Sequence, residues 1–292
     1  MRNGFSLITY LVSDPSQFGV TSYRIVLVTK SLIQPSSKIT MTPFDAALWA
    51  FVSAVPLLTG ALITRYLSLS RKIIVVIMAF GSGSLISVVT FSLMGEAYRL
   101  SGIIEISAGF FVGALSFTYI NHRFITNRIP ISKLESNEEP SEGSGTAMAL
   151  GSLMDNIPEG LAIGISLIVS GTIGVALVSA IAVSNFSESV AGSNSMQYYK
   201  KKGRFILGFW CMIMIFNIIS ATLGFFFLEH VNASVLAIAL SLAAGAILAM
   251  LVETMIPEVF KLGGPHISIA TAAGFLFAFL MVVLNGSELR IL

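Results

Sequence analysis

The chain has 292 residues, of which 55% are hydrophobic and only 11% are charged, and its mean hydropathy is +0.86. A soluble domain carries roughly 25% charged residues, so this composition excludes an ordinary soluble protein and indicates a multi-pass membrane protein. The net charge of +2 gives no reason to expect a nucleic-acid partner. A single cysteine, Cys211, excludes a disulfide or a paired-cysteine redox site within one chain.

Residues 1–40 contain scattered basic residues and two proline breaks but no apolar run long enough to span a membrane. We interpret this N-terminal extension as either a flexible tail or the product of an upstream start. Met41 is then expected to open the folded domain, which covers residues 41–292.

Eight apolar stretches follow, each close to the ~20 residues that a spanning helix requires. They cover approximately residues 44–66, 73–97, 102–121, 146–169, 172–197, 205–228, 233–257 and 267–289. The one long polar connection, residues 122–145, has the composition of a flexible surface loop. The sequence therefore predicts an all-α membrane protein with eight transmembrane helices.

Lysine and arginine residues are distributed unevenly over the connections between these stretches. Most of them lie after the first, third, fifth and seventh stretches, whereas the opposite side holds only Arg99 and Arg290 outside residues 1–40. Because basic residues mark the cytoplasmic side, we expect the variable loop 122–145 in the cytoplasm and both termini outside it.

Two copies of one polar pattern interrupt the fourth and fifth stretches. The first copy is Asp155, Asn156 and Glu159, and the second is Ser184, Asn185 and Glu188. Each copy has a polar residue, an asparagine and a glutamate at i, i+1 and i+4, so the first and last share one helical face. A carboxylate at membrane depth is costly unless it meets a partner, a cavity or a cation, and the pattern therefore predicts a functional site.

The two copies lie on consecutive helices, which must be antiparallel. An internal repeat across such a pair is typical of an inverted-repeat transporter, whose site lies between the repeats near the membrane midplane. Small residues such as Gly160, Gly164 and Ser189 recur at helix-packing spacing, so we expect the two helices to approach closely. Pro158 removes a backbone donor and is expected to kink its helix beside the acids.

The run Asn156-Ile157-Pro158-Glu159-Gly160 resembles the signature His-Asn-x-Pro-Glu-Gly of the ZIP family of divalent-metal transporters (Zrt/Irt-like proteins). The seventh stretch is similar to the family at Glu253 and at Pro257-Glu258, and the resemblance extends from Phe44 to the C-terminus. It implies the eight-helix, inverted-repeat architecture with both termini extracytoplasmic. It also implies transport of a divalent cation such as zinc, manganese or iron into the cytoplasm across the cell membrane.

Several positions depart from the family pattern. Asp155 and Ser184 stand where the fourth and fifth helices usually have His or another strong ligand, and Val252 precedes Glu253 where His is common. The family often has a Glu-Pro pair on the sixth helix, and the best-aligned residues here are Ala221 and Thr222. The loss of imidazole leaves a site built from oxygen atoms, which suits a harder ion such as manganese or magnesium better than zinc.

The predicted metal ligands are Asp155, Asn156, Glu159, Ser184, Asn185, Glu188 and Glu253. The alternatives are a buried glutamate that is protonated or paired with an asparagine, and asparagines that bridge helices by hydrogen bonds. Ser184 is more simply a helix-packing hydroxyl, and Glu253 could line the pathway instead. The metal is expected as a substrate, and no organic cofactor is expected.

The predicted function is therefore divalent-cation transport. The alternative is a non-transporting member of the same fold that senses metal or joins a partner subunit, because the imidazole ligands are missing. We do not expect an enzyme, because the sequence contains no Ser-His, Cys-His or His-Glu-x-x-His arrangement. Expected partners are the lipid bilayer and divalent cations, and a homodimer stays open as the assembly.

Overall fold

The computed structural model describes residues 41–124, 144–172, 174–198, 200–262, 264 and 266–284. The predictions for residues 1–40 and for most of the loop 122–145 fall outside these ranges.

All the elements in the described ranges are helical. They are α1 (Pro43–Tyr66), α2 (Arg71–Val88), the π-helix η1 (Val89–Leu93), α3 (Met94–Leu100), α4 (Ile103–Phe124), α6 (Ser144–Ser170), α7 (Val175–Tyr198), α8 (Gly203–Leu228), α9 (Ala233–Met250), the π-helix η3 (Leu251–Met255), α10 (Ile256–Leu262) and α11 (His266–Leu284). Seven helical runs in the described residues are long and apolar enough to cross a membrane, and α6 adds the shorter apolar segment Asn156–Ser170. The all-α class and the multi-pass membrane character predicted from composition are confirmed.

Polar caps start several of these helices at the boundaries of the apolar stretches. Thr42 and Asp45 form a capping box at α1, where the backbone N–H of Thr42 donates to Asp45 Oδ2 at 2.7 Å. Asn232 Oδ1 accepts from the backbone N–H of Val235 at 2.9 Å at the start of α9. These caps satisfy backbone donors that the first helical turn leaves without partners, so they define where each helix begins.

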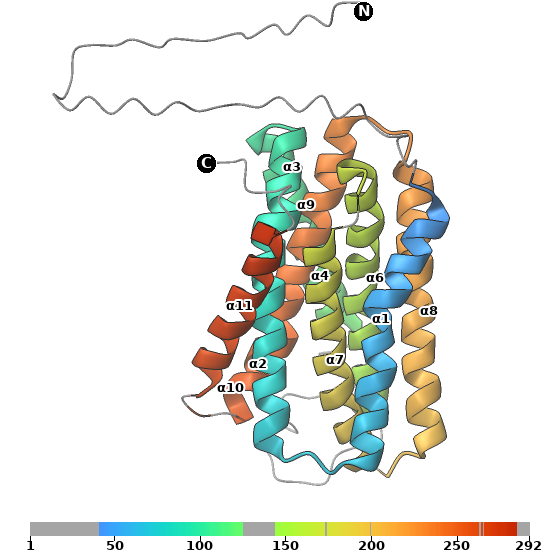
Figure 1. The fold of residues 1–292 in the computed structure, drawn as a ribbon, viewed down its shortest axis with the longest axis vertical. Helices are drawn as coiled ribbons and strands as arrows, with labels where there is room; N and C mark the ends of the chain where they lie inside the picture. Colours follow the sequence, from blue (N-terminus) through green and yellow to red (C-terminus); the bar gives the residue numbers. More distant parts are fainter. Residues whose placement is uncertain are drawn as a thin grey trace, which may run out of the picture. The chain divides into compact units, whose positions relative to one another are not determined.

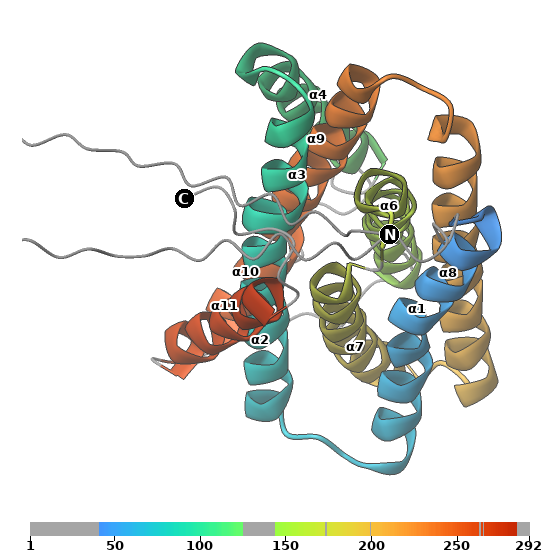
Figure 2. The ribbon, with the colours of Figure 1, turned by 45° about the horizontal axis from the view of Figure 1, so that its top comes forward.

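The helices of the described part form two groups that meet at α6 and α7. In the first, which we call the central group, α7 packs against α1, α6 packs against α8, and α1 packs against α8. In the second, the flanking group, α2 packs against α11, and α4 packs against α9. Figure 2 shows α6 and α7 in the middle, with α1 and α8 on one side and α2, α9 and α11 on the other.

The packing follows an internal two-fold pattern. The α1–α7 contact corresponds to the α8–α6 contact, and the α2–α11 contact corresponds to the α9–α4 contact. A five-residue π-helix follows α2 and another follows α9. The two flanking-group helices that contact α7 and α6 therefore have the same interruption. The first residues of α1 and the last residues of α11 lie at the same end of the bundle (Figure 1).

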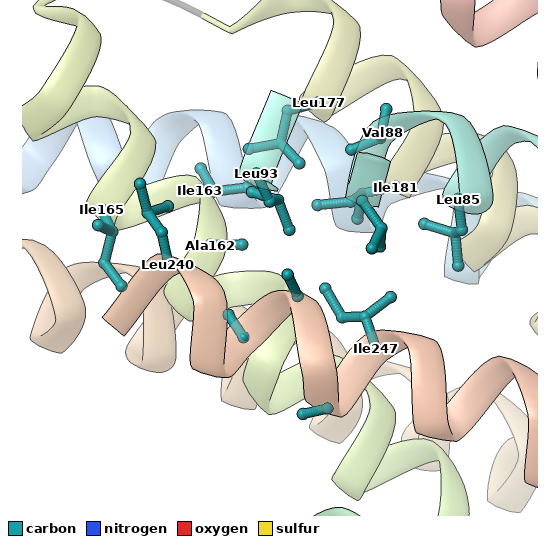
Figure 3. Packing of buried hydrophobic residues seen from close by; sticks show 14 of the residues in the cluster. Leu85, Val88, Leu93, Ala162, Ile163, Ile165, Leu177, Ile181, Leu240 and Ile247 are labelled. Carbon is teal, nitrogen blue, oxygen red and sulfur yellow. The ribbon is translucent and has the colours of Figure 1, made fainter. Parts of the chain in front are cut away.

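Buried apolar side chains fill the interface between the two groups. Figure 3 shows this core, in which α2 and η1 contribute Leu85, Val88 and Leu93, α6 contributes Ala162, Ile163 and Ile165, α7 contributes Leu177 and Ile181, and α9 contributes Leu240 and Ile247. All of them are nearly inaccessible to solvent. The two groups therefore meet largely through apolar contact.

Glycines let the outer helix pairs touch backbone to backbone. A Cβ at Gly274 of α11 would collide with the backbone carbonyl of Phe80 on α2, and one at Gly113 of α4 would collide with the backbone of Leu242 on α9. These contacts hold each pair at one spacing.

We predict that Gly274→Ala lowers the free energy of unfolding by about 1 to 3 kcal/mol, because α2 and α11 must separate to admit the methyl group. The measurement is the thermal unfolding midpoint of the purified protein in detergent. Gly208→Ala on α8 is the matched control, since no atom lies within 4 Å of a Cβ at that position. Equal midpoints for the two variants would contradict the prediction.

Candidate metal site

The first polar copy lies inside α6, which continues through Pro158 as one helix. Asn156 and Glu159 are both fully buried, with 0% of their surface exposed. Asp155 belongs to the same helix, but its side chain lies outside the described residues. The structure thus places two of the three predicted residues of α6 in the interior.

The second polar copy lies inside α7 and has the geometry that its spacing predicts. Ser184 is fully buried, and its hydroxyl donates to Glu188 Oε1 at 3.2 Å. The other carboxyl oxygen, Glu188 Oε2, is buried and has no hydrogen-bond partner among the described residues. The shared helical face of residues i and i+4 is confirmed for this copy.

The asparagines of the two copies bridge helices. Asn185 Nδ2 donates to the backbone carbonyl of Ser53 on α1 at 2.9 Å. On the other side, Asn217 Nδ2 of α8 donates to the backbone carbonyl and to Oδ1 of Asn156, both at 3.3 Å. Each copy is therefore attached to its supporting helix through an amide. Asn185 Oδ1 is nevertheless buried without a hydrogen-bond partner among the described residues, so it retains an acceptor for a ligand.

The small residues of α6 and α7 do not lie between these two helices, where the sequence predicted them. A Cβ at Gly160 or Gly164 of α6 would meet backbone atoms of Asn217 or Ala221 on α8. The Ser189 hydroxyl of α7 donates to the Pro56 carbonyl of α1 at 3.2 Å. The expectation that these residues bring α6 and α7 together is wrong, because their faces meet α8 and α1.

Glu253, the seventh predicted ligand, lies in η3 against α4. Asn121 Nδ2 donates to Glu253 Oε2 at 2.7 Å, and the Thr118 hydroxyl donates to Oε1. Both carboxyl oxygens thus accept hydrogen bonds from α4, and Glu253 connects η3 to α4.

No group of three or more His, Cys, Asp or Glu residues within the described part of the chain is arranged to hold a metal ion. Glu159, Glu188 and Glu253 therefore do not form such a group. A site on α6 and α7 must draw on amide and hydroxyl oxygens as well as carboxylates, together with Asp155 as the sequence predicts.

The structure also gives the positions of two further acids, Glu96 and Glu258. Glu96 of α3 is only 1% exposed, and the Ser166 hydroxyl of α6 donates to it at 3.2 and 3.3 Å from the two carboxyl oxygens. This burial excludes a surface position for Glu96. Glu258 is exposed.

Asn217 is a buried polar residue beside the first polar copy that the family pattern does not point to. The family pattern points to Ala221 and Thr222 on this helix, but Ala221 is core and the Thr222 hydroxyl donates to Ile218 of its own helix. Asn217 lies one turn earlier, fully buried beside Asn156. The available signal was a single asparagine in the middle of a mostly apolar 26-residue helix.

A scan against protein-family models finds no match to this chain, and a search of curated proteins finds no significant relative. The resemblance to the ZIP family therefore rests on the motifs themselves.

We predict that Glu253→Ala costs about 1 to 3 kcal/mol of stability, because the buried Asn121 amide loses its acceptor. The thermal unfolding midpoint in detergent measures the loss. Glu258→Ala, on the following turn and exposed, should change stability by less than about 0.5 kcal/mol. A Glu253→Ala midpoint equal to that of the control would show that the contact with α4 is not stabilising.

Proposed function

We propose that this protein transports a divalent metal cation, such as zinc, manganese or iron, into the cytoplasm across the cell membrane. The proposed ligands come from α6 and α7: Asp155, Asn156, Glu159, Ser184, Asn185 and Glu188. The observation that carries the proposal is the pair of buried acceptors on α7, Asn185 Oδ1 and Glu188 Oε2, for which no described residue supplies a donor.

A cation is the natural partner for these atoms. A buried acceptor without a donor costs about 1 to 3 kcal/mol, and a buried carboxylate costs more. Carboxylate, amide and hydroxyl oxygens are ligands for divalent metals, and Asn185 and Glu188 lie three residues apart on one helix. A bound ion would replace the missing donors and offset the repulsion between the acids of the two helices.

The helix packing supports an inverted-repeat transporter, and the proposed eight spanning helices with both termini outside the cytoplasm follow from the apolar stretches and the basic residues. The pairwise contacts repeat between the two halves of the domain, and the two polar copies lie on the helices exchanged by that repeat. Binding sites of such transporters lie near the membrane midplane, where one group of helices moves against another.

The distribution of hydrogen bonds supports the same mechanism. Asn185–Ser53, Asn217–Asn156 and Ser220–Ile157 all join helices within the central group. The interface with the flanking group is mostly apolar (Figure 3) and is also crossed by the Ser166–Glu96 hydrogen bonds, so movement of the central group as a body keeps its internal bonds.

An apolar layer separates the polar residues from the α6–α7 turn. Ile163 follows Glu159 by one turn on α6, and Ile181 precedes Ser184 by three residues on α7; both are buried in one core with Leu93 of η1. With the orientation that the basic residues predict, this layer closes the extracytoplasmic side. The proposed transporter is therefore in a state that is closed to the outside.

A non-transporting metal sensor of the same architecture is the second candidate. It is favoured by the missing imidazole ligands, since Asp155, Ser184 and Val252 stand where the family often has His. Such a protein would bind the ion through the same residues without moving it across the membrane.

We predict that proteoliposomes containing the purified protein take up Zn²⁺, Mn²⁺ or Fe²⁺ saturably. Glu159→Gln or Glu188→Gln should weaken binding at least about tenfold, because each replaces a charged ligand with a neutral amide. The measurements are uptake reported by an indicator dye inside the vesicles and calorimetric titration in detergent.

Glu258→Gln is the control, because it removes an exposed acid and should leave uptake and binding unchanged. Binding without saturable uptake would favour the sensor over the transporter. Absence of binding for every ion tested, or unchanged binding in both site variants, would refute the proposed site.

A further inference from the structure

A thioether lies beside the Ser184 hydroxyl of α7. Met255, the last residue of η3, is 3% exposed, and its Sδ atom lies 3.9 Å from the Ser184 hydroxyl oxygen. The same hydroxyl donates to Glu188 Oε1 at 3.2 Å. A sulfur atom of the flanking group thus reaches the oxygen ligands of the central group.

The π-helix accounts for this approach. In η3 the backbone N–H of Ile256 bonds the carbonyl of Leu251, five residues earlier, so this turn contains one residue more than an α-helical turn. An additional residue rotates the residues that follow by about 100° around the helix axis. Turns of this kind occur often at functional sites because they redirect side chains in this way.

The two-fold packing pattern provides an internal comparison. Leu93 is the last residue of η1 and occupies the position that corresponds to Met255 in η3. Leu93 is fully buried in the apolar core of Figure 3. Leucine and methionine have similar volumes, so packing at this position requires only an apolar side chain of that size.

Methionine often fills irregular gaps in apolar cores, and this packing role does not require a polar neighbour. Met255 instead contacts a buried hydroxyl that is bonded to a carboxylate, and the second oxygen of that carboxylate lacks a donor among the described residues. The Ser184 hydroxyl therefore contacts both the sulfur of Met255 and the carboxylate of Glu188.

We propose that Met255 Sδ is a metal ligand and that it makes the site select borderline and soft divalent ions, such as Zn²⁺ and Cd²⁺, over Mn²⁺ and Mg²⁺. The inference rests on the proposed function, and it names the substrate class of that same site. Thioether sulfur binds softer ions, whereas hard ions prefer carboxylate, carbonyl and water. Met255 thus reverses the preference expected from the oxygen ligands alone.

The position of the sulfur also links selection to movement. The oxygen ligands belong to the central group, and Met255 belongs to the flanking group. The sulfur contact exists only while α7 lies beside η3, so displacement of the central group removes one ligand. Loss of that ligand weakens binding of a soft ion and favours its release.

The test is a competition between Cd²⁺ and Mn²⁺ for the purified full-length protein in detergent. Met255→Leu should lower the ratio of Cd²⁺ to Mn²⁺ affinity at least about tenfold while Mn²⁺ binding is retained. Met250→Leu is the matched control, because Met250 is buried on the preceding turn in the same apolar core as Met255. Met255→Cys, which keeps a sulfur atom, should preserve the preference for Cd²⁺.

X-ray absorption of the Cd²⁺-loaded wild-type protein gives a second readout that needs no variant. We expect one sulfur neighbour of the ion, and we expect it to be absent in Met255→Leu. An affinity ratio that is unchanged in Met255→Leu, or a wild-type spectrum without sulfur, would overturn the role of Met255 while leaving transport of a cation intact. Failure of the wild-type protein to bind either ion would overturn the proposed function as well.

Discussion

The cost of placing amide and carboxyl groups inside apolar helices is the constraint on which the rest of this structure depends. Asn185 offsets this cost by donating a hydrogen bond to the Ser53 carbonyl of α1, and Asn156 offsets it by accepting one from Asn217 of α8. Such a bond has one good geometry, so each polar helix is held in one register against its support. The small residues beside these amides then lie at the contacts with α8 and α1, where the helices approach most closely.

Division into two groups follows from the same constraint. Hydrogen bonds are directional, and a helix tied by them cannot slide along its partner without leaving polar atoms unsatisfied. Contacts between apolar side chains have no such requirement, and the core shown in Figure 3 lies where the central and flanking groups meet. Apart from the Ser166–Glu96 hydrogen bonds and the Ser184–Met255 contact, the described contacts across this interface are mostly apolar, so movement there breaks fewer hydrogen bonds than movement within the central group. The polar residues of α6 and α7 lie beside this interface, which is where the proposed transport would move one group against the other.

Local patterns in the sequence predicted those features that depend on neighbours along the chain. The apolar stretches gave the helices, and the i, i+4 spacing placed Ser184 and Glu188 on one face. Contacts between helices were not predictable in this way: the bonding of Glu253 to α4 and the burial of Glu96 depend on which helix lies opposite. The π-turn of η3 could not be predicted either, because an additional residue in a helical turn changes neither composition nor hydropathy.

The two halves of the domain pack alike, and this likeness separates what folding requires from what function requires. Where both halves have a glycine at a close helix contact, the residue serves packing. Where corresponding positions differ in chemistry, packing alone does not explain the difference. At the contact with α7 a backbone carbonyl of Ser53 accepts the bond, whereas at the contact with α6 the side chain of Asn217 donates it. At the ends of the two π-helices, Leu93 and Met255 both belong to the apolar core, and Met255 also places a sulfur atom beside Ser184. Both differences lie next to the polar residues of α6 and α7, so these residues have asymmetric surroundings within a scaffold whose two halves pack alike.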